Sequence, residues 1–357
     1  MGVLFLRSAL VVAAIGLGSI LPAMTATAAS VGSLKTEVFA TGGSSLSKPD
    51  DITAMRGSVF VAWQNGVGPM GEPAADGNAQ STVVQYSSTG GVINRWQLTG
   101  RVDGMTADAQ RNRIIATVNE DGNSSLYVIT GDRLDHFTYS GLVQGGGTDA
   151  PHVYRGEIFI TASSPSDATQ PAVYRATLSG GVAMLSPVFF DDSTASIANP
   201  GGGNTTLGLS DPDSNNVVPG SSPRFGHDFM LDSQGDGQLI FAHNAGTAAQ
   251  QLFVLNLSPE AGTANNPVSV DDTVWATADR GTLYATDGSN MVYAVSGHFG
   301  VGTALSAVTP GNANNAGSGP NFLATLNLDT GGLTPVVDVR FPPKGLVFVA
   351  GAEGDAN

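Results

Sequence analysis

Short apolar stretches alternate with polar turns along most of the chain, and one arrangement recurs five times. Each copy begins with an acidic residue and continues through an apolar stretch, a polar turn with Gly, Asn or Arg, a second apolar stretch and a polar end. The copies, measured from the acid to the polar end, are 51–65, 103–119, 149–163, 228–244 and 272–287. This near-constant spacing predicts a two-stranded hairpin in each copy.

Further hairpins follow several of these copies. Glycine-containing turns at 86–92, 127–134, 174–181 and 326–332 separate pairs of apolar stretches. Two successive hairpins make a four-stranded antiparallel unit, and such units at a spacing of roughly 40 to 80 residues, with no amphipathic helix between them, predict a β-propeller. A β-sandwich is the alternative, but it gives no reason for the same acidic start to recur.

The expected fold is all-β, a single propeller domain over 29–357. We expect six blades of four antiparallel strands, with five or seven as alternatives. The segments 34–40 and 343–349 each predict a strand near one end of the chain. A last blade that pairs the two termini would close the ring and hide its edges. The segments 186–223 and 311–320 interrupt the repeat and are rich in Gly, Asn, Ser and Pro, which predicts long surface loops.

The first 28 residues follow a different pattern. Arg7 precedes an apolar run over 9–21, and Pro22 and several small residues lead up to Ala28. This pattern is typical of a cleaved secretory signal peptide, and the run is shorter than the ~20 apolar residues of a transmembrane helix. We therefore expect a secreted or periplasmic protein whose mature chain begins near Ala29.

Charge and cysteine content narrow the range of partners. The chain has 15 Lys and Arg against 30 Asp and Glu, a formal net charge of −15, and no cysteine. An acidic surface repels nucleic acid and anionic lipid, and the lack of cysteine excludes disulfides, thiolate metal sites and thiol nucleophiles. We expect no nucleic-acid partner, no membrane insertion after signal cleavage, and a monomer with a small-molecule, glycan or protein ligand at its axial face.

The acidic strand starts are expected to converge around one mouth of the propeller channel. The innermost strand of a blade begins on the face to which the second strand returns, so starts and ends lie on the same side. The candidate metal ligands are Asp51 (with Asp50 beside it), Asp103, Asp149, Asp228 and Asp272. Crowded carboxylates raise one another's pKa unless a cation neutralises them, and hard oxygen ligands suit Ca²⁺, Mg²⁺ or Mn²⁺. The alternative is that each aspartate caps its own turn by accepting backbone N–H bonds.

A family resemblance starts from the same residues. The stretch 102–108, VDGMTAD, followed by 114–116 and Asn119, resembles the strand-start motif of the SMP-30/gluconolactonase family of six-bladed propellers, and 48–52, KPDDI, resembles another copy. NHL and strictosidine-synthase-like propellers share much of this pattern. The resemblance implies a calcium or zinc ion in the channel and lactone hydrolysis, with Asp103 as ligand and base. The family's early Gly-Glu-Gly-Pro ligand motif and its Pro-Asn-Gly strand start have no counterpart in this chain.

Histidines supply a second set of candidates. His152, His227 and His243 lie near the starts or ends of the third and fourth copies. His227, beside Asp228, is a candidate catalytic base or metal ligand. The alternative is that His152 packs near a strand start and His243 caps a turn. The segment 210–216, SDPDSNN, offers alternating oxygen ligands but lacks the glycine and closing Glu of an EF-hand, so we expect a surface loop. A lid folded over the mouth is a further alternative for this segment.

Two functional hypotheses remain. The chain has no Gly-x-Ser-x-Gly elbow, phosphate-binding loop or His-Glu-x-x-His motif, which disfavours serine hydrolases and nucleotide hydrolases. The first hypothesis is a secreted lactonase-type hydrolase that uses a divalent cation, calcium foremost and Mg, Mn or Zn as alternatives, with Asp103 and His227 as catalytic residues. The second is a non-catalytic propeller that binds its ligand through the loops 66–80 and 186–223.

Overall fold

The computed structural model describes residues 31–143, 147–165, 169–259, 268–312, 315–316 and 320–351. The expected signal peptide, 1–28, lies outside these residues. The described secondary structure consists of strands and one short 3-10 helix, η1 (Gln234–Asp236). No helix in this part of the chain is long and apolar enough to cross a membrane.

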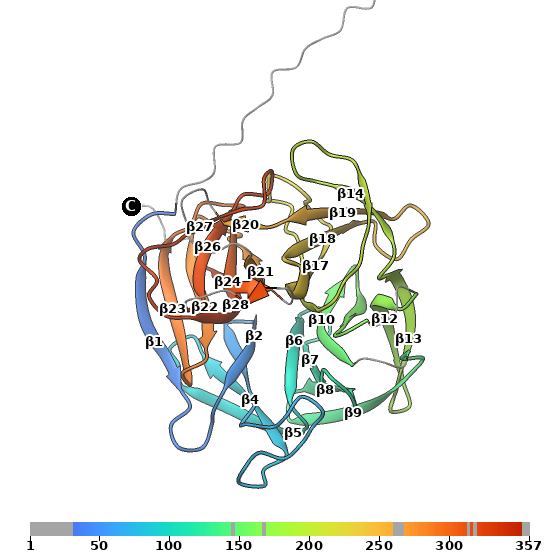
Figure 1. Cartoon of the computed structure of the whole chain (residues 1–357). Coiled ribbons are helices and arrows are strands. Elements are labelled where there is room, and N and C mark those ends of the chain that lie inside the picture. Colours follow the sequence, from blue (N-terminus) through green and yellow to red (C-terminus); the bar gives the residue numbers. More distant parts are fainter. Residues whose placement is uncertain are drawn as a thin grey trace, which may run out of the picture.

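The strands are arranged around a central axis (Figure 1). The chain passes from sheet to sheet round the disc, except that the strands between 268 and 350 alternate between two neighbouring sheets. This is the propeller-like all-β arrangement that the sequence predicts. Within the described residues the strands pair into five sheets and not into six separate blades. One four-stranded sheet follows the order β2 (Pro49–Met55), β3 (Ser58–Trp63), β4 (Gln80–Ser87) and β5 (Val92–Thr99).

The eight-stranded sheet contains two antiparallel units of four strands. The first unit is β6 (Val102–Asp108), β7 (Arg113–Val118), β8 (Ser125–Thr130) and β9 (Arg133–Ser140). The second unit is β10 (Thr148–Tyr154), β11 (Glu157–Ala162), β12 (Pro171–Ser179) and β13 (Val182–Phe190). A short parallel pairing of β9 with β13 joins their outer edges, which is why six separate sheets are not observed.

The remaining sheets come from the second half of the chain. One has the order β15 (Asn204–Thr206), β14 (Thr194–Ile197), β19 (Gln251–Asn256), β18 (Gln238–His243), β17 (Phe229–Ser233) and β16 (Pro212–Val217). The next has β20 (Ser258–Pro259), β27 (Gly332–Pro335), β26 (Phe322–Leu326), β24 (Ala304–Asn312) and β21 (Val268–Trp275), with β25 (Asn315–Ala316) beside β24. The last has β1 (Lys35–Thr41), β23 (Met291–His298), β22 (Arg280–Asp287) and β28 (Pro343–Ala350).

Most of the predicted hairpins are present. The first four copies form the hairpins β2–β3, β6–β7, β10–β11 and β17–β18. The fifth copy, 272–287, is not a hairpin, because β21 pairs with β24 while β22 pairs with β23 and β28. The strands β1 and β28, from opposite ends of the described chain, lie in the same sheet on either side of the β22–β23 hairpin (Figure 1).

The segment 186–223 is more structured than the sequence predicts. It contains β14, β15 and β16, and β16 pairs with β17 at the inner edge of its sheet. The segment 210–216 therefore belongs mainly to a strand and is not a surface lid. The sequence of β16, PDSNNV, has too few apolar residues to show the alternation that marks a strand.

Six strands face the axis and are called the inner strands: β2, β6, β10, β16, β21 and β28. Each contacts the next, and β28 contacts β2, so they form a closed cycle. Buried apolar side chains fill the space between neighbouring sheets. Phe159 and Phe229, for example, come from different sheets and pack edge to face with ring centroids 5.3 Å apart. This packing holds the inner strands in fixed positions around the axis.

Every inner strand has the same bulge near its start, where two of its residues oppose a single residue of the adjacent strand. The bulges are 50–51 opposite Ala62, 103–104 opposite Thr117, 149–150 opposite Thr161, 213–214 opposite Asp232, 271–272 opposite Ala307, and 344–345 opposite Thr286. The inner strands approach closely here, since a Cβ added to Gly104 would lie 2.3 Å from the Ala150 Cα. Bulges redirect side chains and are common beside functional sites.

Candidate functional site

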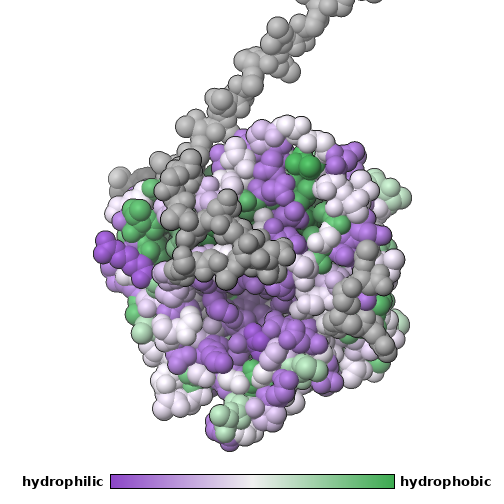
Figure 2. Space-filling model, viewed as in Figure 1, coloured by the Kyte–Doolittle hydropathy of each residue, from purple (hydrophilic) through white to green (hydrophobic). Residues whose placement is uncertain are grey.

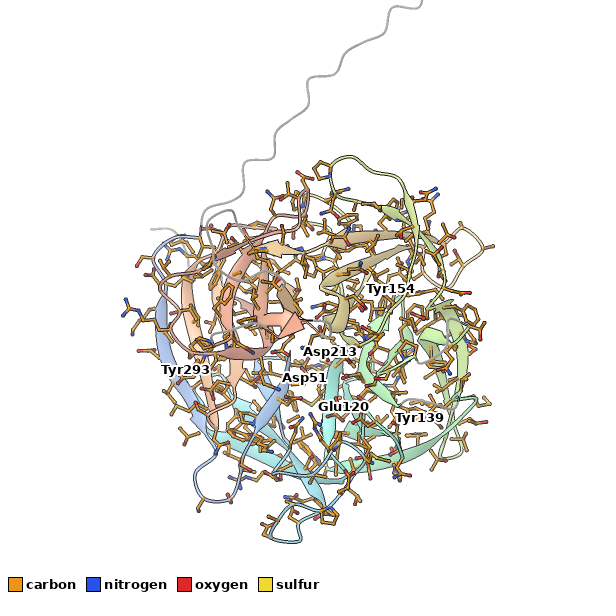
Figure 3. All side chains as sticks on the ribbon, in the orientation of Figure 1. Asp51, Glu120, Tyr139, Tyr154, Asp213 and Tyr293 are labelled. Carbon is orange, nitrogen blue, oxygen red and sulfur yellow. The ribbon has the colours of Figure 1, made fainter. Side chains whose placement is uncertain are left out.

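The first residue of each bulge occupies the same position on its inner strand. These six residues, here called the bulge ring, are Asp50, Asp103, Asp149, Asp213, Asp271 and Lys344. Because the six strands surround the axis in the same register, their side chains gather at its centre. Figure 3 shows Asp213 there, together with Asp51 and Glu120 from neighbouring positions.

The bulge ring surrounds a cavity of about 520 Å³. Figure 2 shows a hollow lined by hydrophilic residues at the centre of this face of the disc. The acidic lining residues are Asp50, Asp51, Asp103, Glu120, Asp121, Asp149, Asp211, Asp213, Asp271 and Asp272. The only Lys or Arg side chains among the described lining residues are Arg101 and Lys344. The cavity is therefore strongly acidic.

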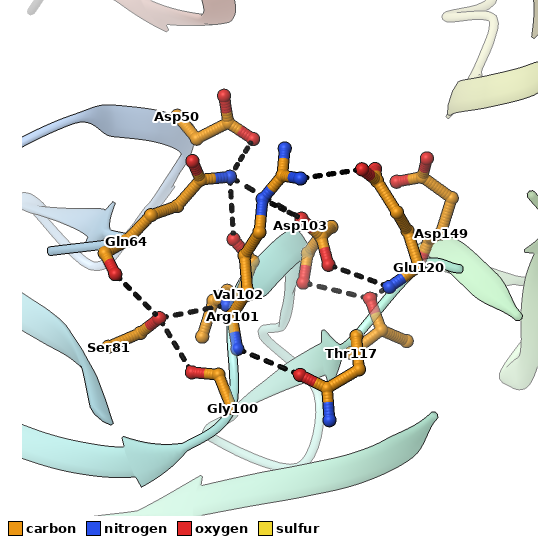
Figure 4. Close-up of polar contacts among 12 residues, drawn as sticks. Asp50, Gln64, Ser81, Gly100, Arg101, Val102, Asp103, Thr117, Glu120 and Asp149 are labelled. Carbon is orange, nitrogen blue, oxygen red and sulfur yellow. Dashed lines mark hydrogen bonds and ion pairs between the residues drawn. The ribbon is translucent and has the colours of Figure 1, made fainter. Parts of the chain in front are cut away.

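Two basic side chains neutralise one side of the cavity. The Arg101 Nε atom lies 2.9 Å from Asp103 Oδ1, and its Nη1 atom lies 2.7 Å from Glu120 Oε1 (Figure 4). On β28, the Lys344 Nζ atom lies 2.9 Å from Asp50 Oδ1. The acids carried by β2, β6 and the chain after β7 thus have positive partners from the protein itself.

Other acids are engaged by neutral donors. Asp51 accepts hydrogen bonds from the backbone N–H groups of Ile52, at 2.6 Å, and of Met105 on β6. Asp272 accepts the N–H of Leu346 on β28 at 2.7 Å. Because each bonds the adjacent inner strand, Asp51 and Asp272 connect neighbouring units of the disc. This role differs from the capping of their own turns that the sequence left as an alternative.

Neutral side chains donate hydrogen bonds to another acid of the bulge ring, Asp271. Asp271 accepts hydrogen bonds from Gln234 Nε2 at 2.5 Å, Asn321 Nδ2 at 3.0 Å and Thr309 Oγ1 at 3.1 Å. These neutral donors lower the electrostatic cost of a buried carboxylate without supplying a positive charge.

The acids of β10 and β16 have a different environment. Burial, followed by the charges of Glu120 and Asp103, raises the pKa of Asp149 well above its usual value. Burial and the charge of Asp149 do the same to the pKa of Asp213. Burial, together with Glu120, raises the pKa of Asp211 to about 6. Since Arg101 and Lys344 form their ion pairs elsewhere, the described residues provide no ion pair for these acids.

Four of the five expected metal ligands line the cavity: Asp51, Asp103, Asp149 and Asp272. The expectation that Asp228 joins them is wrong. Asp228 precedes β17, which is the second strand of its sheet because β16 lies inside it, and its Oδ1 atom lies 2.7 Å from His243 Nδ1. Neither Asp228 nor the adjacent His227 belongs to the cavity lining.

His152 is the one expected histidine in the cavity wall, among the residues described. Burial lowers its pKa to about 4, so the imidazole is neutral at pH 7. No three His, Asp or Glu side chains of the described residues form a ready-made metal-binding group. The acids near His152 therefore have the chemistry of cation ligands without a preformed coordination geometry.

The sequence reasoning did not place Glu120, Arg101 or Lys344 in the site, and it assigned Asp213 to a surface loop. A usable signal was present in the triplets at the bulges: PDD at 49–51, VDG at 102–104, TDA at 148–150, PDS at 212–214, VDD at 270–272 and PKG at 343–345. Aligning the copies on these triplets, in place of the apolar stretches, would have placed Asp213 and Lys344 with the other strand starts.

No family model matches the chain, and no curated protein matches it in sequence. Among solved structures, a protein of unknown function from Bacteroides caccae is 8% identical, with a TM-score of 0.49 over 85% of this chain and 86% of that one. The periplasmic gluconolactonase of Pseudomonas aeruginosa is 12% identical, with a TM-score of 0.45 over 85% and 88%. Myxococcus xanthus glutaminyl cyclase is 10% identical, with a TM-score of 0.40 over 74% and 94%. The family suggested by the sequence motifs stays a prediction.

Proposed function

We propose that the protein binds a divalent cation in its axial cavity and uses it to hydrolyse a lactone or a related ester. The observation that carries the proposal is the group of buried acids on the β10–β16 side, Asp149, Asp211 and Asp213, which line the cavity without an ion pair from the described residues. A cation between these carboxylates would relieve both their repulsion and the cost of their burial. In this proposal the disc is a six-bladed propeller closed by β1 and β28, and it acts outside the cytoplasm after cleavage of 1–28.

The donor atoms fit a hard cation. Asp149, Asp211, Asp213 and Asn215 all line the cavity, and Asn215 Nδ2 donates to the carbonyl oxygen of Ala150, the residue after Asp149. The Asn215 Oδ1 atom is buried and accepts no hydrogen bond within the described residues. Oxygen ligands in an irregular arrangement suit calcium, which accepts six to eight of them in flexible geometry, better than magnesium. Magnesium, manganese and zinc remain alternatives.

The chemistry of hydrolysis would fall to the neighbouring acids. A bound divalent cation supplies Lewis-acid polarisation of a carbonyl group. Asp103 is the proposed base: burial, followed by the charge of Glu120, raises its pKa well above the usual value, while Arg101 opposes that rise. A carboxylate with a raised pKa accepts a proton from water more readily than an ordinary one. Arg101, paired with both acids, would hold Asp103 in position.

A second candidate is non-catalytic binding of a cationic ligand. This function is favoured by Asp51 and Asp272, which connect inner strands. Acids with a structural role of this kind can remain in a cavity that binds a ligand without catalysing a reaction. This candidate expects the cavity to bind cations without turning over a substrate.

The two functions are separated by one set of assays on the mature protein. After treatment with a chelator, hydrolysis of γ- and δ-lactones is followed by pH-stat with calcium, magnesium, manganese or zinc added. The hydrolase proposal expects cation-dependent turnover that Asp103→Asn abolishes while Asp228→Asn leaves it intact. Stabilisation by calcium without hydrolysis would favour the binding function. A thermal midpoint that no cation changes would contradict the metal site and the hydrolase together.

A further inference from the structure

Lys344 stands at a position where the other five members of the bulge ring are aspartates. The register makes this equivalence unambiguous, since 344–345 oppose Thr286 just as 103–104 oppose Thr117 and 149–150 oppose Thr161. Five carboxylates and one ammonium group thus surround the axis at one level. The ammonium group is the only positive charge that the bulge ring contributes to the cavity.

The Lys344 side chain is held within the cavity. Its Nζ atom lies 2.9 Å from Asp50 Oδ1, with 39% of the lysine side chain exposed and 18% of the aspartate side chain. The inner strand β28 lies between β2 and β21, which carry Asp50 and Asp271. The charge of Asp50, against the opposing effect of burial, raises the pKa of Lys344, and the charge of Asp271 adds to this effect.

We propose that Lys344 is a built-in cation that determines how many metal ions the cavity holds. Its ammonium group fills the sector between Asp50 and Asp271 and confines a divalent cation to the sector of Asp149 and Asp213. This inference rests on the proposed cation site and adds a residue that sets its stoichiometry and position.

The charge balance explains the effect. With Lys344 in place, Asp50 is neutralised by an ion pair and also accepts a hydrogen bond from Gln64 Nε2 at 2.8 Å. Without the ammonium group, Asp271 would keep only its neutral donors, and Asp50 would keep the Gln64 hydrogen bond and the charge of Arg101, which pairs with Asp103 and Glu120. A second hard cation would then find carboxylate oxygens there, and the positive charge that repels it would be absent.

If Lys344 had only a structural role, its removal would not be expected to change the number of bound ions. An ion pair of this exposure contributes little stability, and removal of such a pair would not create a binding site. The number of bound ions therefore separates the two roles, whereas stability alone does not.

The test compares the full-length mature protein with Lys344→Met, which removes the charge and keeps the length of the side chain, and with Lys344→Arg, which keeps the charge. Bound calcium is counted by equilibrium dialysis and elemental analysis. We expect about one ion per chain in the wild type and Lys344→Arg, and about two in Lys344→Met. Lys344→Gln serves as a second neutral variant if Lys344→Met fails to fold, as judged by circular dichroism.

The outcomes distinguish this inference from the function on which it rests. Equal numbers of calcium ions in the wild type and the neutral variant would overturn the role of Lys344 and leave the proposed site standing. No ion in the wild type and one in the neutral variant would support the role of Lys344 and contradict the proposed site. No ion in either protein would overturn both.

Discussion

The Thr161 hydroxyl donates a hydrogen bond to the Asp213 carbonyl oxygen at 2.8 Å and so joins β11 to the inner strand of the neighbouring sheet. Thr117 and Thr286 hold the corresponding positions opposite their bulges. Each of them also donates to a carbonyl oxygen of the next inner strand. These threonines fix the spacing of the bulge ring, and with it the positions of the cavity acids.

Asp232 holds this position opposite the bulge of β16. It is fully buried, and neither carboxylate oxygen has a hydrogen-bond partner within the described residues. An unsatisfied buried polar group costs about 1–3 kcal/mol. We therefore expect Asp232→Thr to raise the free energy of unfolding by about that amount, measured by urea denaturation, because a hydroxyl there can donate as Thr161 does.

The matched control for that variant is Thr161→Ala, which should lower the free energy of unfolding by about 1 kcal/mol through loss of the inter-sheet hydrogen bond. An Asp232→Thr variant that is less stable than the wild type would contradict the expectation that the buried carboxyl group is destabilising.

Ionisation of Asp272 should make the protein less stable as the pH rises. Burial raises its pKa to about 7, whereas the unfolded chain has a value of about 3.9. The folded state therefore binds this proton more tightly, so the contribution is fully present below about pH 4 and is lost as the pH rises through 7. Asp272→Asn keeps an oxygen for the Leu346 N–H and removes the titration. In chelator, the free energy of unfolding of the wild type relative to this variant should fall between about pH 4 and 7.

His152 acts in the opposite direction over part of the same range. Burial lowers its pKa to about 4, so its contribution is lost as the pH falls from about 6.5 towards 4. Because both proteins retain His152, its effect cancels in the difference between the wild type and Asp272→Asn. A difference that does not change with pH would show that Asp272 does not titrate in this range.

Loss of Arg101 should destabilise the protein more than loss of an ordinary surface charge. Its guanidinium pairs with Asp103 and Glu120, and the Asp103 side chain is only 2% exposed. Arg101→Gln leaves both carboxylates without their ion pair, which in buried sites costs about 3–5 kcal/mol. Urea denaturation in chelator measures this loss, and Arg133→Gln, at an exposed ion pair, is the control. Equal effects of the two substitutions would mean that solvent already screens the cavity acids.

Export can be tested at the amino terminus. If 1–28 is a cleaved signal, the protein recovered from outside the cytoplasm should begin near Ala29. Edman sequencing or intact mass measurement decides this, and an exported protein that still begins with Met1 would contradict the prediction.

The hairpins could be predicted from the sequence because alternating apolar residues and polar turns specify which face of a strand is buried. The same pattern does not specify the partner of a strand. This is why β21 and β22, adjacent in sequence and correctly placed as strands, were wrongly paired with each other. The polar sequence of β16, PDSNNV, does not show the apolar alternation of a strand, so only its PDS triplet marks it as a strand start. Its pairing with β17 depends on the whole sheet.

The residues of the cavity were also predicted only in part. Asp103 and Asp149 were found because their copies begin at the inner strand. Asp228 was wrongly grouped with them because its copy begins at the second strand, a difference that only the hydrogen-bond order of the sheet reveals. The pairing of Lys344 with Asp50 joins residues 294 positions apart, and no local pattern encodes such a contact.

The most direct test of the account is the response to calcium of the wild type and of the double variant Asp149→Asn/Asp213→Asn, with Asp228→Asn as control. The thermal midpoints of the wild type and the control should rise with calcium, by the equivalent of about 2.7 kcal/mol at 100 times the dissociation constant. The double variant should be more stable than the wild type without calcium, because two repelling acids are gone, and should not respond to calcium. A wild-type midpoint unchanged by calcium, magnesium, manganese or zinc, or an equal rise in the double variant, would contradict a cation site at Asp149 and Asp213.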